Sequence, residues 1–248
     1  MKITLITVVY NGGKYLEDCI LSVIAQDYKD LEYIIIDGAS TDSSLQIANR
    51  YKDQISLIVS EKDKGMYDAL NKGIALAKGE VIGILNADDM LASSDVLTKV
   101  ANAFAQTGVD GVYGNLNYIN PENPSKIIRK WKGKAYSLAG IRRGWMPAHP
   151  TLYLKKALFY KLGNYSLNFG SAADYELMLR FLYKFRINAF YCDTLMVNMR
   201  TGGMSNASLK HRQSAFTNDL KAIRQNGIKF AYLTLLLKKI RKIQQFLL

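Results

Sequence analysis

Apolar runs alternate with amphipathic stretches through residues 1–106, and this alternation leaves few folds open to the chain. The apolar runs are short and rich in β-branched residues, as strands are, over 2–9, 31–36, 55–60 and 80–84. Apolar residues recur at helical spacing over 15–26, 43–51, 66–77 and 96–106. Strands that alternate with helices in this way predict a parallel sheet with right-handed crossovers. We therefore expect an α/β fold whose sheet is buried on both faces.

Polar residues stand where three of these strands are expected to end. They are Tyr10 and Asn11, then Asp37, then the run Asn86-Ala87-Asp88-Asp89. The carboxyl ends of parallel strands share one edge of a sheet, and ligands bind at that edge. Two adjacent carboxylates repel each other, which favours binding of a hard cation between or beside them. The alternative is that Asp88 and Asp89 are ordinary loop residues, one of which caps the next helix.

Composition and short motifs argue against several classes of protein. Apolar residues make up 49% of the chain, which is enough for a substantial core. No G-x-G-x-x-G follows the first strand and no P-loop motif occurs, so dinucleotide and P-loop binding lose their main support. The two cysteines fit no metal spacing and predict a reduced, cytoplasmic setting. The N-terminus lacks the apolar region of a signal peptide, and no run is long enough to span a bilayer.

The positive charge is concentrated in the last 41 residues, which carry eight of the twelve net positive charges. Apolar residues of this tail recur at helical spacing: Leu233, Leu236, Leu237, Ile240, Ile243 and Leu247. Basic residues, Lys238, Lys239, Arg241 and Lys242, lie off that face. We expect an amphipathic helix on an anionic membrane, at the inner face of the plasma membrane. The alternative is a helix packed on the domain or on a second subunit of a homodimer.

The middle of the chain is less regular. Both tryptophans, Trp131 and Trp145, stand in a proline-containing stretch where acceptor-recognition loops could lie. One or both could instead anchor that loop to the core. His149 lies between two prolines, and a lone histidine of this kind is usually structural. Asp174 is expected in the first turn of a helix, where an acid also interacts favourably with the helix dipole.

Five stretches, in this order, resemble family 2 glycosyltransferases, in particular small bacterial enzymes of exopolysaccharide and lipopolysaccharide assembly. They are Thr7-Val8-Val9-Tyr10-Asn11, residues 33–42, residues 61–73, Leu85-Asn86-Ala87-Asp88-Asp89 and residues 173–180. The likeness covers residues 1–205, which we expect to form the catalytic domain, with 206–248 as the tail. It departs from the family pattern at Asn86 and Ala173, where acids are common, and after Asp37, where Gly38 replaces a second acid.

The resemblance implies a GT-A fold, a Rossmann-like mixed and mainly parallel sheet flanked by helices, with the helical tail added. It implies inverting transfer of one sugar from a nucleotide-diphosphate sugar, UDP-linked in most relatives, to a saccharide or lipid-linked acceptor. By the same resemblance Asp37 binds the base, Asp88 holds Mn²⁺ or Mg²⁺, and Asp174 is the general base. The other donor-binding residues that it implies are Thr7, Tyr10, Asn11, Asp68, Asn71, Lys72, Asn86, Ala87, Asp89, His149 and Arg200.

Two other classes remain open. A catalytically degenerate copy that recruits partners to a membrane is favoured by Asn86, Ala173 and the basic tail, but Asp88 and Asp174 are both present. A sugar nucleotidyltransferase is favoured by Asn11-Gly12-Gly13-Lys14, which weakly resembles a glycine-rich phosphate-binding loop. Nucleic-acid binding is not expected, since the charge sits on an amphipathic tail without a nucleic-acid motif.

Overall fold

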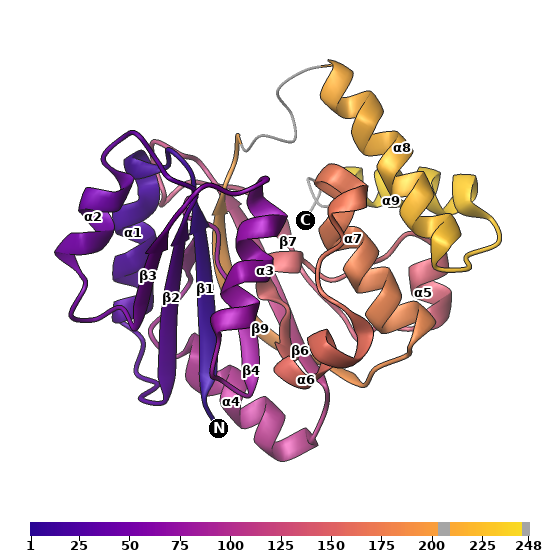
Figure 1. Cartoon of the computed structure of the whole chain (residues 1–248). Helices are drawn as coiled ribbons and strands as arrows, with labels where there is room; N and C mark the ends of the chain where they lie inside the picture. Colours follow the sequence, from indigo (N-terminus) through magenta and orange to yellow (C-terminus); the bar gives the residue numbers. More distant parts are fainter. Residues whose placement is uncertain (203–208, 245–248) are drawn as a thin grey trace.

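A mixed sheet of nine strands runs through the computed structural model, which describes residues 1–202 and 209–244 (Figure 1). Its first half is parallel and has the order β3-β2-β1-β4. These strands are β1 (Ile3–Val9), β2 (Leu31–Asp37), β3 (Leu57–Ser60) and β4 (Val81–Ile84). All four fall within the stretches that the sequence pattern predicts as strands, apart from Asp37 at the end of β2. Residues of β1 alternate between the two cores on either side of the sheet, which is why its sequence is apolar throughout.

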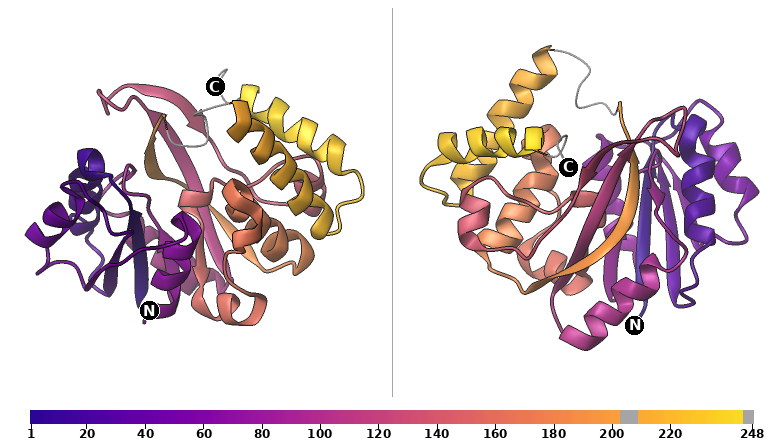
Figure 2. Two further views of the ribbon diagram at one scale, coloured as in Figure 1. Left: turned by 45° about the horizontal axis from the view of Figure 1, so that its top comes forward. Right: turned by 180° about the vertical axis from the view of Figure 1, so that it is seen from behind.

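The second half of the sheet joins β4 through an antiparallel strand, β8 (Tyr153–Lys155). It continues through β6 (Gly111–Ile119) and β9 (Ala189–Arg200), which pair in parallel, to the short β5 (Met90–Leu91). β7 (Ile127–Trp131) pairs antiparallel with the far end of β6. The β6–β7 hairpin reaches α1, as both views of Figure 2 show, and its Glu122 carboxylate accepts a hydrogen bond from Lys14 at 2.6 Å.

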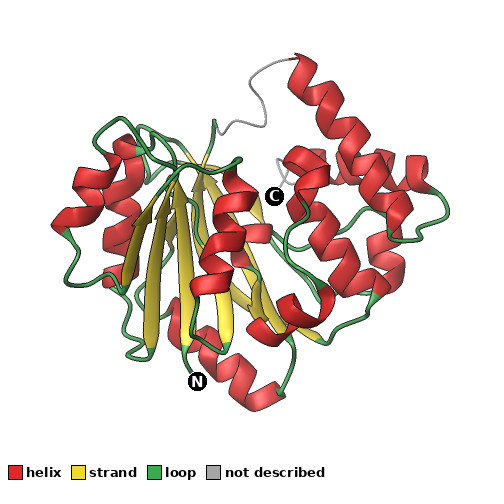
Figure 3. Cartoon of the chain, viewed as in Figure 1, coloured by secondary structure: helices red, strands yellow, loops and turns green. Residues whose placement is uncertain are grey.

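Helices cover both faces of this sheet (Figure 3). On one face lie α1 (Gly13–Ile24), α2 (Ser44–Arg50) and α4 (Val96–Thr107). On the other lie α3 (Met66–Leu76) and the helices of the second half. These are α5 (Leu138–Arg142), α6 (Lys156–Leu162), α7 (Ala173–Met178) and the short helical turns η1 (His149–Thr151), η2 (Leu167–Ala172) and η3 (Leu179–Lys184). The structure therefore has the expected three-layer α/β arrangement.

The C-terminal segment forms two helices, α8 (Leu209–Gln225) and α9 (Ala231–Gln244), which pack beside α5 and α7 (Figure 1). Ile223, Ile228 and Leu235 are buried in the same core cluster as α7. The Lys238 ammonium pairs with Asp219 at 2.8 Å and lies 3.4 Å from the ring centre of Tyr175 in α7. The tail is thus helical, as expected, and part of it is packed on the domain.

A different side of α9 stays exposed. Leu233, Leu236 and Ile240 are 52%, 55% and 43% exposed, and they belong to the predicted apolar face. The Leu247 position and the side chain of Ile243 lie outside the described part of the chain. Among residues 1–202 and 209–244, no helix is both long and apolar enough to cross a bilayer.

Candidate active site

The ends of β1 and β2 meet in a turn that their polar residues hold together. Asn11 has a left-handed backbone (φ 49°), and its side-chain oxygen accepts the Thr41 backbone N–H at 2.8 Å. The Asp42 carboxylate accepts the Gly13 N–H at 2.9 Å. A Cβ at Gly13 would lie 2.5 Å from the Ser43 hydroxyl oxygen, so the close approach of the two loops requires glycine there. Asn11 therefore shapes the rim of the sheet edge.

Asp37, the last residue of β2, is fully buried at this edge. One carboxylate oxygen, Oδ2, accepts hydrogen bonds from the Ser60 hydroxyl at 2.6 Å and the Ser40 N–H at 3.1 Å. The other, Oδ1, is buried and has no hydrogen-bond partner among the described residues. Buried oxygens without a partner are rare in native proteins, because the lost solvation is costly. Asp37 therefore has one acceptor oxygen that no described residue satisfies, and base binding by it stays a prediction.

Two further predicted residues lie in or directly after β1, and one is exposed whereas the other is buried. The Tyr10 ring is 67% exposed. A Cβ on Gly38 would lie 3.3 Å from that ring and 2.5 Å from the Asp63 carboxylate, so Tyr10 and Asp63 flank the Asp37–Gly38 turn. Thr7 is fully buried instead, and its hydroxyl accepts a hydrogen bond from Tyr33 at 3.1 Å. Thr7 thus lies beneath the turn, and direct contact with a nucleoside stays a prediction for it.

The adjacent acids after β4 differ in what they contact. Asp89 is fully buried, and its two oxygens accept the Asn86 side-chain N–H at 3.0 Å and the Arg200 backbone N–H at 3.2 Å. Burial and then the neighbouring Asp88 charge raise the pKa of Asp89 well above its usual range. Asp88 is partly exposed, and burial raises its pKa as well. No other residue of the described chain donates a hydrogen bond to the Asp88 carboxylate, so it can bind a ligand.

Arg200 lies under this acidic loop. Its guanidinium donates to the Asp88 carbonyl at 2.9 Å, pairs with Asp18 of α1 and sits 4.5 Å from the ring centre of Tyr15. The side chain is only 2% exposed. Arg200 therefore holds this loop in place from its buried side. Its contact with donor phosphates stays a prediction. The residues from Gly203 to Ser205, a little further along the chain, lie outside the described part.

A divalent metal fits this loop if the substrate supplies ligands too. Within the described residues no three His, Cys, Asp or Glu side chains gather around one point. Magnesium and manganese sites that bind nucleotides commonly use one or two carboxylates plus phosphate oxygens. Asp88 offers one such carboxylate, whereas both oxygens of Asp89 already have partners.

Asp174 lies in the first turn of α7. One of its carboxylate oxygens accepts the Tyr175 backbone N–H at 2.7 Å, and the side chain is partly exposed. In η2, which precedes α7, the backbone is kinked at Gly170 (φ 47°). Burial is the main cause of a raised pKa at Tyr118 on β6, and the charges of Asp89 and Asp174 add to that rise.

His149 lies in the same region as Asp174. Its Nε2 atom is 2.7 Å from the Tyr165 hydroxyl, and burial lowers the pKa of its ring although the Asp174 charge opposes that shift. The structure thus brings His149 next to the candidate base. Whether it touches donor or acceptor stays a prediction.

Three predicted donor-binding residues of α3 have structural contacts. The Asp68 carboxylate accepts the Lys64 N–H at 2.9 Å at the start of the helix. Lys72 donates to the Lys62 carbonyl at 2.8 Å and pairs with Glu61. Asn71 exchanges two hydrogen bonds with the backbone of Tyr165, at 2.9 and 3.0 Å. Donor binding by these three residues stays a prediction.

The contacts among several aromatic residues were not foreseen from the sequence. Tyr118 and Arg129 face each other on the β6–β7 hairpin, with the guanidinium carbon 3.6 Å from the ring centre, and Trp131, from the predicted acceptor-recognition stretch, stacks on the same tyrosine. Tyr67, from the stretch 61–73, stacks on Tyr165. The register of β7 and the packing of α3 create these contacts.

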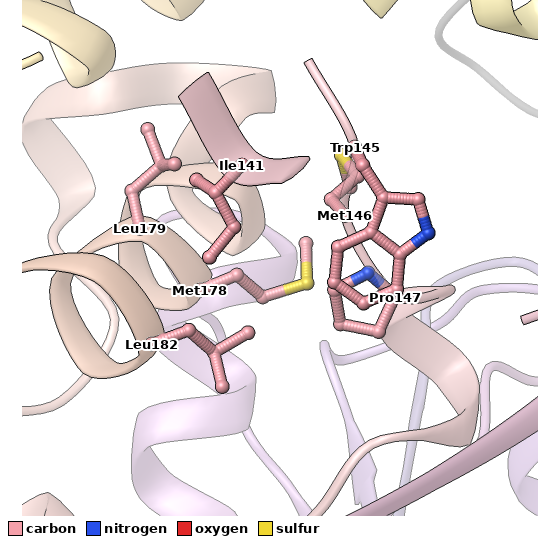
Figure 4. Close-up of a pocket in the computed structure, with 7 residues that line it drawn as sticks. All are labelled: Ile141, Trp145, Met146, Pro147, Met178, Leu179 and Leu182. Atoms are coloured by element: carbon pink, nitrogen blue, oxygen red, sulfur yellow. The ribbon is translucent and has the colours of Figure 1, made fainter. Parts of the chain in front are cut away.

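The apolar pocket of Figure 4 lies between α5 and the continuous helical segment α7–η3. None of the residues that line it is acidic. Its lining is apolar: Ile141, Trp145, Met146, Pro147, Met178, Leu179 and Leu182. A nucleotide sugar requires polar partners, so this pocket does not suit one. Trp145 is 7% exposed and anchors its loop to the core, as the structural interpretation of the sequence anticipates.

Comparison with known proteins identifies the class. The family model of glycosyl transferase family 2 matches residues 4–170, and the chain belongs to this family. It is 29% identical over 205 residues to a PGL/p-HBAD biosynthesis glycosyltransferase of Mycobacterium bovis, covering 79% of this chain and 76% of the relative. Glycosyltransferase GlyG of Streptococcus pneumoniae is 33% identical over 116 residues, 46% of this chain and 38% of the relative. The chain is therefore a transferase enzyme.

Solved structures confirm the GT-A fold. S. aureus TarS 1-349 in complex with UDP-GlcNAc has a TM-score of 0.69 at 18% identity, covering 94% of this chain and 69% of that one. The mannosyltransferase PcManGT from Pyrobaculum calidifontis, in complex with GDP-Man and Mn²⁺, has a TM-score of 0.66 at 19% identity, covering 95% and 69%. Nucleotide-sugar donors are thus bound by glycosyltransferases that share this fold.

Proposed function

We propose that this chain is an inverting, metal-dependent glycosyltransferase that moves one sugar from a UDP-sugar to a saccharide or lipid-linked acceptor in cell-surface polysaccharide synthesis. The observation that carries the proposal is the unpaired, buried Oδ1 of Asp37, at the same sheet edge as Asp88. The imide N–H of uracil would satisfy this oxygen. Tyr10 would then cover the base, and Asn11 would hold the turn beneath it.

On this proposal the metal neutralises the diphosphate as it leaves, and Asp88 holds it. The carboxylates of Asp88 and Asp89 would otherwise repel the donor's phosphates. Asn86 would keep Asp89 in place through its hydrogen bond and contact the donor with its remaining polar groups. Arg200 would hold the backbone of this loop in place through its hydrogen bond to the Asp88 carbonyl.

Asp174 would take the proton from the acceptor hydroxyl. An alcohol is a weak nucleophile, so its proton must leave during the attack, and a carboxylate within reach can accept it. Attack from the side opposite the diphosphate inverts the anomeric carbon. Asp88 would then act on the leaving group and Asp174 on the acceptor.

The site of action that we propose is an anionic membrane surface. Leu233, Leu236 and Ile240 form an exposed apolar stripe on α9, and the tail is strongly basic. Such a helix can lie in the headgroup region with its apolar side inward. This placement would bring a lipid-linked acceptor to Asp174.

A donor panel tests the central proposal. The protein is incubated with Mn²⁺ and either UDP-glucose, UDP-galactose, UDP-GlcNAc or GDP-mannose, without acceptor, and slow release of the nucleoside diphosphate is measured. We expect hydrolysis of at least one UDP-sugar, and loss of UDP affinity in Asp37→Ala. Hydrolysis of GDP-mannose alone would contradict the assignment of uracil. Formation of a nucleoside triphosphate with added pyrophosphate would instead identify a nucleotidyltransferase.

A further inference from the structure

Two asparagines, Asn117 of β6 and Asn198 of β9, are direct partners on neighbouring strands, and we call their side chains the amide pair. The Asn117 side-chain N–H donates to the Asn198 side-chain oxygen at 3.5 Å, the outer limit of a hydrogen bond. Asn117 is only 9% exposed, and Asn198 is partly buried. Asparagine is depleted in strands, and a buried polar group costs stability unless it is well satisfied. The amide pair therefore stands where two apolar side chains would stabilise the sheet better.

Most of the hydrogen-bonding capacity of the amide pair is unused. Each amide group has two N–H donors and one acceptor oxygen. Within residues 1–202 and 209–244, the contact between the two side chains is the only hydrogen bond that either of them makes. The side-chain oxygen of Asn117 and the side-chain N–H groups of Asn198 are therefore available to a ligand.

The strand register places the amide pair next to the acidic loop. Asn198 pairs with Met90 of β5, which directly follows Asp89 in the chain. Two positions further along β9, the Arg200 backbone N–H donates to the Asp89 carboxylate, and the Arg200 guanidinium donates to the Asp88 carbonyl. The end of β9 that carries the amide pair is thus the same segment that holds the loop of Asp88.

The amide pair belongs to the face of the sheet on which α7 packs. Leu116 and Val197 each precede one of the two asparagines, and both point into the core that α1 and α4 cover. Because successive side chains of a strand point to opposite faces, Asn117 and Asn198 point to the other face. That face is covered by α3 and α7, and Asp174 lies in the first turn of α7.

We propose that the amide pair binds hydroxyl groups of the sugar that is transferred. This role rests on the proposed function and names the part of the site that would hold the donor's sugar. A metal at Asp88 would bind the diphosphate, so the sugar attached to that diphosphate must lie beside the same loop. A hydroxyl group both donates and accepts a hydrogen bond. The Asn117 oxygen can therefore accept from one sugar hydroxyl while the Asn198 N–H group donates to another.

Comparison of UDP with UDP-sugars tests this role, because UDP lacks the sugar. Affinities for UDP, UDP-glucose, UDP-galactose and UDP-GlcNAc are measured by calorimetry with Mn²⁺ on the wild type, Asn117→Ala and Asn198→Ala. For the UDP-sugar that the wild type binds most tightly, we expect a loss of about threefold to tenfold in each variant, as is typical for lost hydrogen bonds between neutral groups. UDP affinity should stay at the wild-type value, and the three UDP-sugars should bind with more similar affinities than in the wild type.

Asn102→Ala is the matched control, since Asn102 is exposed on α4, and it should change none of these affinities. UDP binding also reports folding, and Asn198, the more exposed of the two, carries the test if Asn117→Ala does not fold. Wild-type affinity for the UDP-sugars in the variants would overturn the sugar-binding role. An equal loss for UDP and UDP-sugar would overturn it too, because the pair would then only support the acidic loop.

These two outcomes leave the proposed function standing, provided that the wild type hydrolyses a UDP-sugar in the donor panel. A wild type that hydrolyses no UDP-sugar and binds none would overturn the proposed function and the sugar-binding role together.

Discussion

At the scale of single residues, the carboxylates have separate proposed tasks that single substitutions can distinguish. Asp37 is the last residue of β2, Asp88 lies in the loop after β4, and Asp174 lies in the first turn of α7. Among the described residues, Asp37 keeps one oxygen without a hydrogen-bond partner. Their roles should therefore separate cleanly into donor binding, metal binding and proton transfer.

Asp174→Asn should lower turnover by at least about a hundredfold, because an amide keeps the shape but cannot take the acceptor's proton. UDP affinity should remain near that of the wild type, since Asp174 contacts none of the residues at the end of β2. Turnover, UDP affinity and melting temperature are measured on the same preparation. A variant that melts early but still transfers sugar at the wild-type rate would show that Asp174 is only a helix-terminal acid.

Asp88→Ala should abolish the dependence of UDP binding on metal. With Mn²⁺, the wild-type protein should bind UDP at least about tenfold more tightly than with chelator, because the ion neutralises the repulsion between the phosphates and this loop. Calorimetry with and without chelator measures both proteins. An affinity that chelator leaves unchanged in the wild type would contradict metal binding by Asp88. Asp95→Ala, which removes an exposed acid at the start of α4, is the control.

At the scale of elements, the docking of α9 depends on one glycine. A Cβ at Gly144, whose φ is +76°, would lie 2.3 Å from the Lys238 backbone nitrogen and 2.7 Å from the Thr234 carbonyl oxygen. Backbone atoms cannot move aside as a flexible side chain can. Gly144→Ala should therefore lower the free energy of unfolding by about 2–4 kcal/mol, as measured by denaturant titration.

Gly140→Ala is the control for this experiment. The nearest atom to its Cβ is the Ser137 hydroxyl oxygen at 3.0 Å, which belongs to a side chain, and Gly140 lies within helix α5. Its stability should stay within about 1 kcal/mol of the wild type, since alanine is the better helix former. Equal stability in both variants would mean that α9 does not need the close approach at Gly144.

The elements differ in how far the sequence foretells them. β1, β2 and β4 are buried on both faces, so their apolar runs are unbroken and the predictions end within one or two residues of the structure. β8 has only three residues, and β7 carries charged side chains on an exposed edge, so neither has a clear pattern. Their places are set by pairing with β6, and the paired residues Gly111 and Leu154 of β6 and β8 are far apart in the sequence.

The residues of the candidate site also differ in how well the sequence predicts them. Asp37 and Asp88 could be proposed from the sequence because they end or closely follow buried strands, and strand ends converge. The stacking of Tyr67 on Tyr165 joins residues that are distant in the chain, and it depends on how α3 packs on the core. Thr7, which is expected to bind the donor, is buried, and its contact with Tyr33 depends on the pairing of β1 with β2.

At the scale of the whole molecule, the exposed stripe of α9 makes membrane binding testable without cutting the chain. Ile228 and Leu235 are buried in the core, so deletion of the tail would expose apolar surface and obscure the result. The triple variant Leu233→Ser, Leu236→Ser and Ile240→Ser changes only exposed positions. It should lose binding to vesicles that contain anionic lipid, while the wild type floats with them.

Leu21→Ser is the matched control, since Leu21 is 46% exposed on α1. It should float like the wild type. Neutral vesicles and added salt should both weaken wild-type binding, because part of the attraction is electrostatic. If the wild type and the triple variant stay unbound to the same extent, α9 is not a membrane anchor, and analytical ultracentrifugation would test a second subunit on this face.

The contact between Lys238 and the ring of Tyr175 has a consequence for protein engineering. Tyr175 is the neighbour of Asp174 in sequence, so α9 packs directly against the helix that carries the candidate base. Glycosyltransferase tails are attractive parts to exchange when an enzyme is to be redirected to another surface. Here such a chimera must retain the inner side of α9, with Thr234, Leu235 and Lys238, and vary only the outer side. Retargeting this enzyme therefore requires substitutions on the exposed side of α9, while the helix itself is kept.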